Sequence, residues 1–182
     1  MRLLTLCWVL LLAALAAAQR PQGSDVWEPY RFLLGTWAAE GHGQPGQGKG
    51  SFTFGFELQG KILVRRNSLQ FPATPQRPAF AHDDLLIIYR EGDATPNRAV
   101  YFDSEGFVIH YAVVFSDNGK MLSFVSEAMP KAPRQRLTYL QNADGTLYVK
   151  FELAPADKPD SFVTHVEGIA RRVEKGAAPI EH

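Results

Sequence analysis

Histidine and carboxylate side chains gather in one short segment and have the clearest chemical potential in this chain. His82, Asp83 and Asp84 directly precede an apolar run. Two further acidic residues, Asp103 and Glu105, fall on the neighbouring expected hairpin. A histidine held beside carboxylates can transfer protons to or from a bound molecule. Because the same residue types also form turns and face solvent, both interpretations stay open.

A pair of arginines interrupts an otherwise apolar stretch. Arg65 and Arg66 lie within residues 62–69, where a strand is expected, so one of the two must face the interior if side chains alternate. A buried arginine needs a partner, either a carboxylate of the protein or the carboxylate of a fatty-acid-like ligand. The residues favour neither alternative. Further possible donors to a ligand are Arg134, Arg136 and Arg172.

A third candidate is His110, which lies in the most apolar expected strand, residues 107–115. An inward His110 would either orient a ligand or be a hydrogen-bonded core histidine. The remaining histidines lack the short spacing between ligand residues that dedicated zinc sites show, so no zinc site is predicted. Nucleophile-elbow and phosphate-loop motifs are also missing from the sequence, which removes the usual signals of hydrolysis and nucleotide use.

The elements that must position these residues are strands. Residues 52–58 and 147–153 alternate apolar and polar side chains, the pattern of strands with one buried face. Short turn signals divide the rest into similar lengths, which predicts antiparallel neighbours in an up-and-down, closed, all-β barrel of about ten strands; a sandwich is the alternative. A short helix is expected within residues 25–34, with Asp25 and Glu28 as a capping box. The strands are expected to begin near Thr36, Gly50, Lys61, Asp83, Arg98, Phe107, Lys120, Gln135, Thr146 and Ser161.

The first 18 residues have the pattern of a secretory signal peptide. Arg2 is their only charge, and the apolar run ends in three alanines, the small-residue pattern of a cleavage site after Ala18. This pattern predicts a secreted or periplasmic protein. The single cysteine, Cys7, lies within the segment, so thiol chemistry is not expected of the mature chain.

Residues 19–182 are expected to form a single domain, because no linker interrupts them. The 19 basic and 19 acidic residues of the chain balance, which argues against binding nucleic acid through net charge. No later segment approaches the ~20 apolar residues of a membrane span, so no integral membrane segment is expected after signal removal. We expect a monomer or weak homodimer.

The start of the expected barrel carries a recognisable signature. Residues 33–43 read LLGTWAAEGHG. This segment resembles the Gly-x-Trp opening of calycin-type (lipocalin and fatty-acid-binding) barrels, and in particular the nitrobindin-like haem-binding barrels. Trp37 would then close the barrel floor, while Gly41 and Gly43 would allow a close strand crossing.

A second resemblance lies near the other end. Residues 165–172 read HVEGIARR and are similar to the last strand of nitrobindin-like barrels, whose histidine is the proximal haem ligand. The resemblance implies that role for His165. The resemblance supports the barrel fold better than it supports haem, because Gly168 and Ala170 depart from the family pattern.

The expected function is therefore the binding of a small apolar or amphipathic ligand inside an exported barrel. A fatty-acid-like carboxylate is the first ligand class and haem the second, and no enzyme activity is predicted. One alternative is an enzyme that uses His82, Asp83, Asp103 or His110, and the other is an interaction module whose barrel is filled by side chains. The proline-rich stretch 71–81 is expected to cover the mouth as a stiff lid. The candidate ligand-binding residues are Trp37, Phe54, Phe56, Arg65, Arg66, Tyr101, His110, Arg136 and Arg172, with His165 as haem ligand.

Overall fold

The computed structural model describes residues 25–92, 95–116 and 118–173. The predicted signal peptide, residues 1–18, lies outside this part of the chain. Within the described residues, no helix is long and apolar enough to cross a membrane.

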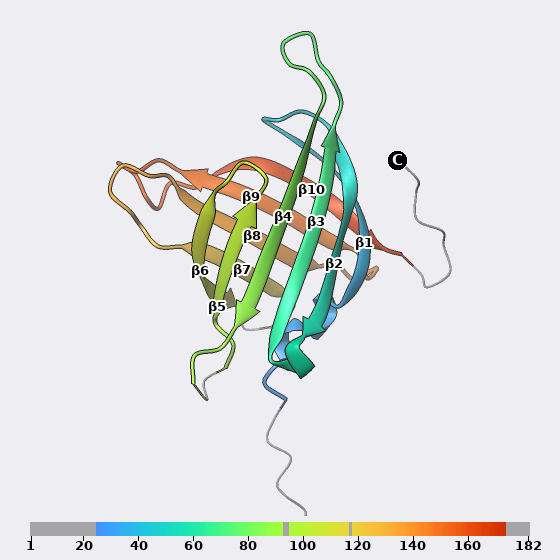
Figure 1. Cartoon of the computed structure of the whole chain (residues 1–182), viewed down its shortest axis with the longest axis vertical. Coiled ribbons are helices and arrows are strands. Elements are labelled where there is room, and N and C mark those ends of the chain that lie inside the picture. Colours follow the sequence, from blue (N-terminus) through green and yellow to red (C-terminus); the bar gives the residue numbers. More distant parts are fainter. Residues whose placement is uncertain (1–24, 93–94, 117, 174–182) are drawn as a thin grey trace, which may run out of the picture.

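Ten strands close into one antiparallel barrel (Figure 1). Each strand pairs with its neighbours in sequence, and β1 pairs with β10 to close the ring. The prediction of an all-β, up-and-down barrel is confirmed, and each strand begins within three residues of its expected position. The strands are β1 (Gly35–Gly43), β2 (Gly48–Glu57), β3 (Ile62–Phe71), β4 (Phe80–Tyr89), β5 (Arg98–Asp103), β6 (Val108–Phe115), β7 (Met121–Ser126), β8 (Arg134–Gln141), β9 (Leu147–Ala154) and β10 (Val163–Arg172).

The expected N-terminal helix is a 3₁₀ helix, η1 (Glu28–Leu33); a single 3₁₀ turn, η2 (Leu58–Gly60), joins β2 to β3. The predicted capping box does not form, because Trp27 occupies the N-cap position. The Asp25 carboxylate instead accepts a hydrogen bond from the Trp27 backbone N–H at 3.0 Å and pairs with Arg31. The helix lies at the lower end of the barrel in Figure 1.

Aromatic and aliphatic side chains fill this lower end. Trp37 is completely buried, and its indole Nε1–H donates to the Leu33 carbonyl at 2.8 Å, so β1 is tied to η1. Phe52 stacks on the Trp37 ring, and Phe54 packs edge-on against Phe52. Trp37 therefore closes the barrel floor, as the Gly-x-Trp signature predicted.

Two glycines let β1 and β10 approach closely. Gly41 faces Gly168 in the register of the pair. A Cβ atom on Gly168 would lie 2.3 Å from the Glu40 carbonyl oxygen, and a Cβ atom on Gly41 would lie 2.6 Å from the Glu167 carbonyl oxygen. Both contacts are with backbone, so only glycine fits at these positions.

The connection between β3 and β4 is shorter and more regular than predicted. β3 continues to Phe71 and β4 begins at Phe80, where the two rings stack with centroids 4.7 Å apart. Residues 72–79 form a hairpin closed by a bridge between Thr74 and Arg77, and this hairpin rises above the barrel in Figure 1. The irregular stretch predicted over residues 71–81 is therefore limited to residues 72–79, because Phe71, Phe80 and Ala81 belong to the paired strands.

Candidate functional site

The upper half of the barrel encloses a cavity of about 760 Å³. The cavity lies at the end formed by the β1–β2, β3–β4 and β5–β6 turns, which all contribute to its wall. Much of the wall is apolar and includes Leu69, Ile109, Leu137, Val149, Phe151 and Leu153. Side chains therefore do not fill this end of the barrel.

A buried ion pair lies in the wall of the cavity. Arg65 points inward from β3 and its Nη2–H donates to Asp84 Oδ1 on the adjacent strand β4. The two side chains are only 6% and 3% exposed. The other terminal nitrogen of Arg65 donates to the Tyr139 hydroxyl. Of the two partners that the sequence left open for an inward arginine, the structure contains the protein carboxylate.

Asp84 is held by several donors at once. Its Oδ2 accepts a hydrogen bond from Asn67 Nδ2 at 2.8 Å and lies 3.4 Å from His82 Nε2. Burial alone would raise the pKa of Asp84, but the charge of Arg65 and the hydrogen bonds from Arg65 and His82 outweigh burial and hold that pKa below its usual value. Asp84 is therefore a carboxylate at neutral pH.

His82 connects the buried Arg65–Asp84 pair to the mouth of the cavity. Its Nδ1 lies 3.1 Å from Glu105 Oε1, and its Nε2 lies 3.0 Å from the Tyr101 hydroxyl. The hydrogen bond to Asp84 is the largest influence on the pKa of His82; with Glu105 it outweighs burial and raises that pKa to about 9. The imidazole is therefore protonated at neutral pH. From the rim inward, the side chains of Glu105, His82, Asp84 and Arg65 then alternate between negative and positive charge.

Tyrosine hydroxyls surround the ion pair on the cavity side. Burial raises the pKa of Tyr101, Tyr111 and Tyr139 well above the usual value, so all three remain protonated. We use the name polar cluster for Arg65, Asn67, His82, Asp84, Tyr101, Glu105 and Tyr139.

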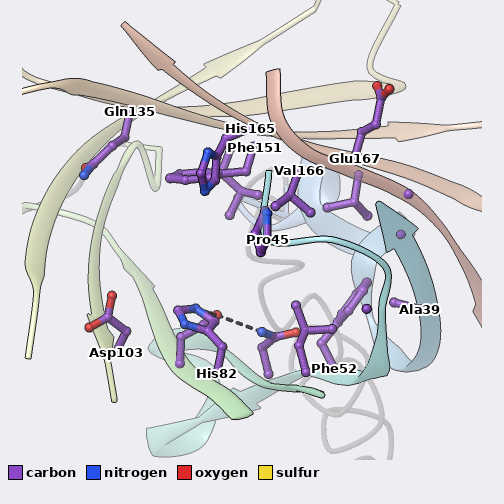
Figure 2. A pocket seen from close by; sticks show the side chains of 18 of the residues that line it. Ala39, Pro45, Phe52, His82, Asp103, Gln135, Phe151, His165, Val166 and Glu167 are labelled. Atoms are coloured by element: carbon purple, nitrogen blue, oxygen red, sulfur yellow. Dashed lines mark hydrogen bonds and ion pairs between the residues drawn. The ribbon is translucent and has the colours of Figure 1, made fainter. Parts of the chain in front are cut away.

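His165 lies across the cavity from the polar cluster. β10, which carries His165, is separated from β4 by three strands of the ten-stranded ring. Figure 2 shows His165 beside Phe151 on one side of the pocket and His82 with Asp103 on the other. The His165 and Phe151 rings meet edge-on with centroids 6.0 Å apart. Burial lowers the pKa of His165, so its imidazole is neutral at neutral pH.

Three of the ten predicted site residues line the cavity, namely Arg65, Tyr101 and His165. Trp37 and Phe54 are buried below the cavity, and Phe56 packs against Trp27 at the lower end. The structure corrects their assignment to a ligand site because the packed floor separates them from the open half of the barrel.

Strand alternation places the other predicted arginines outside the cavity. Arg66 is exposed and pairs with Glu57 at 2.9 Å, and Arg136 pairs with Glu152 at 2.6 Å. Arg172 lies over the Trp37 ring below the cavity. None of these guanidinium groups is available to a ligand in the interior, which corrects their prediction as ligand-binding residues.

Two residues of the predicted enzymatic alternative also face outward. His110 is exposed on β6, and Asp83 is exposed on β4. Neither lines the cavity, because inward positions on these strands are taken by their neighbours Ile109, Tyr111, His82 and Asp84. The polar cluster thus retains His82 but contains neither His110 nor Asp83.

Sequence reasoning missed Asn67 and Tyr139 as members of the site. Asn67 is two residues from Arg65 on the same strand, so period-two alternation was a usable signal for it. Tyr139 is 74 residues from Arg65 in the sequence, and no local pattern links the two. Only closure of the barrel brings this tyrosine to the arginine.

No protein-family model matches the chain, and no curated protein matches its sequence. The closed ten-stranded barrel with a tryptophan at its floor is consistent with a calycin-like barrel.

Proposed function

We propose that this chain is an exported binding protein that holds a small, largely apolar molecule inside the barrel. The observation that carries the proposal is the cavity of about 760 Å³, which falls within the range of about 300 to 1,000 Å³ of small-molecule sites. An apolar wall with a few polar groups on one side is the usual lining of such sites. The predicted signal peptide supports export.

The charges of the polar cluster indicate which end of a ligand lies against it. Both terminal nitrogens of Arg65 already donate to protein groups, and its charge is balanced by Asp84. A second carboxylate brought to this place would face Asp84 without a free cation to balance it. We therefore favour an uncharged polar group on the buried end of the ligand over the fatty-acid carboxylate that the sequence suggested.

Titration of the mature protein with a neutral apolar dye such as N-phenyl-1-naphthylamine tests the proposal. We expect a saturable rise in dye fluorescence, reversed by competing apolar ligands. Val149→Trp places a large side chain in the cavity wall and should weaken binding by about tenfold or more, a loss of about 1.4 kcal/mol.

The matched control is Tyr148→Trp, because Tyr148 is the next residue on β9, does not line the cavity, and donates its hydroxyl hydrogen bond to Glu167. It should bind the dye as the unmodified protein does. Dye binding that is not saturable, or that both variants weaken equally, contradicts the proposal. Circular dichroism and melting curves of both variants show whether the fold is retained.

A second candidate ligand is haem, which the resemblance to nitrobindin-like barrels implies. The residues fit this group: His165 lines the cavity, its imidazole is in the neutral form that binds iron, and Phe151 lies against it. His165 would hold the iron, and the apolar residues of β9 would contact the macrocycle. Bound haem would supply a metal centre for binding a small gas or for electron transfer.

A haem titration followed by absorption tests this candidate. We expect a sharp Soret band that is lost in His165→Ala and kept in His42→Ala, whose imidazole is exposed on β1. A band that does not depend on His165 excludes this ligation. Dye binding without a Soret band supports the general proposal and removes haem as its ligand.

A further inference from the structure

We infer that His82, Asp103 and Glu105 form a binding site for a divalent transition-metal ion at the mouth of the cavity. The site goes beyond the proposed function, which needs no metal ion. The sequence placed these residues on neighbouring segments but predicted no metal site there, because the ligands come from β4 and from the end of β5 with its following turn.

The geometry of the three side chains fits one small cation. One ligand atom from each residue lies within 4.8 Å of the other two. His82 Nδ1 and Glu105 Oε2 are 3.0 Å apart. Tetrahedral zinc with bonds of about 2.1 Å separates its ligand atoms by about 3.4 Å. No pair of ligand atoms is therefore more than about 1.4 Å further apart than such a zinc ion requires.

The Asp103 carboxylate is oriented for this role by its own turn. Its Oδ1 accepts hydrogen bonds from the backbone N–H groups of Glu105 at 3.1 Å and Phe107 at 2.9 Å. These contacts fix the carboxylate beside His82 and leave Oδ2 for a further ligand. Figure 2 shows Asp103 and His82 side by side at the pocket wall.

Residues behind the proposed metal site hold the His82 ring in a fixed orientation. A metal-bound histidine commonly directs its second ring nitrogen to a carboxylate or another polar partner, which fixes the ring. Here Nε2 of His82 faces the Tyr101 hydroxyl at 3.0 Å and Asp84 Oδ2 at 3.4 Å. Asp84 is in turn fixed by Arg65 and Asn67, so the support extends into the barrel core.

The ligand set indicates the class of metal. One imidazole nitrogen with two carboxylates suits zinc and similar transition metals, whereas magnesium and calcium prefer oxygen ligands alone. On binding, the ion displaces the proton from His82 Nδ1, because a metal binds only the unprotonated nitrogen. Three protein ligands leave at least one coordination position open, as in zinc sites that bind substrate or water. All three residues line the cavity, so a ligand with an oxygen donor would be able to complete the coordination.

Calorimetric titration of the untagged mature protein with Zn²⁺ alone tests the inference. We expect one equivalent to bind, and Glu105→Gln and His82→Ala each to weaken binding by about tenfold or more, since even partners that only support a ligand typically cost about 10- to 100-fold when removed. Glu105 is 41% exposed, so its substitution leaves the fold intact even where His82→Ala does not.

Two control variants locate the bound ion. Asp83→Asn removes an exposed carboxylate next to His82, and His42→Ala removes an exposed imidazole that does not line the cavity. Both should bind Zn²⁺ as the unmodified protein does. Absence of binding, or binding lost in either control and kept in Glu105→Gln, overturns the inference. Because dye binding is measured without zinc, its failure and the failure of this inference are separate results.

Discussion

The Arg172 guanidinium lies 4.3 Å above the ring of Trp37, directly across the seam between β1 and β10. Its Nη1–H and Nη2–H groups donate to the Leu34 and Phe32 carbonyls at the end of η1. One side chain therefore joins the last strand, the first strand and the helix that covers the floor. This contact closes the barrel where the two ends of the domain meet.

Arg172→Ala should lower the free energy of unfolding by about 1 to 2 kcal/mol, because both the cation–π contact and the carbonyl hydrogen bonds are lost. Urea unfolding followed by tryptophan fluorescence measures the change. The control is Arg171→Ala, whose side chain is exposed on the same strand. Equal losses in the two variants would show that the Trp37 contact contributes nothing.

Breaking the Arg65–Asp84 pair should lower the free energy of unfolding more than breaking any surface ion pair. Arg65→Met leaves a buried carboxylate without its cation, and the expected loss is about 3 to 5 kcal/mol. Replacing both residues, as Arg65→Met with Asp84→Leu, should recover part of that loss, since no unpaired charge remains. A double-mutant cycle by denaturant unfolding checks this, and additive losses in the double variant would contradict it.

The glycine at the β1–β10 crossing should not tolerate a methyl group. Gly168→Ala places a Cβ atom against the Glu40 carbonyl, and the backbone shift that follows should cost about 1 to 3 kcal/mol or more. Gly55→Ala on β2 is the control, because a Cβ atom there meets nothing within 4 Å. Melting temperatures of both variants measure the difference. A Gly168→Ala protein as stable as the control would show that the seam can widen freely.

The outer face of β8 and β9 should contribute to acid sensitivity. Glu152 accepts two hydrogen bonds from Arg136, at 2.6 and 2.9 Å, and Lys150 lies 3.0 Å away. Burial opposes the charge of Glu152, but the hydrogen bonds from Arg136 and Lys150 outweigh it and hold its pKa below the usual value. The stabilisation is therefore present above the unfolded pKa of about 4.3 and is lost as the pH falls through the lower folded value.

Glu152→Gln should accordingly be about 1 to 2 kcal/mol less stable than the unmodified protein at pH 7, with the value reduced because Arg136 and Lys150 are partly exposed. The two proteins should approach equal stability near pH 3. Glu57→Gln, which removes an exposed pair with Arg66, is the control and should change stability little at either pH. A constant difference across the pH range would exclude this linkage.

The sequence alone determined the architecture. Period-two alternation in β2 and β9 and short turn signals between strands are local patterns, and antiparallel neighbours require only local connections. The Gly-x-Trp opening likewise predicted the floor, because a large buried ring and close-approach glycines impose local demands that few residue types meet. The short N-terminal helix was predicted in place, and the structure shows that it is a 3₁₀ helix with Tyr30 and Leu33 buried.

The tertiary structure decided the site. Whether Arg65 or Arg66 faced inward depended on register, because a shift of one residue exchanges the faces of a strand. The same one-residue rule placed His82 and Asp84 in the cavity wall and left His110 and Asp83 outside. The contact of Arg65 on β3 with Tyr139 on β8 joins residues far apart in the sequence, so it exists only once the barrel has closed.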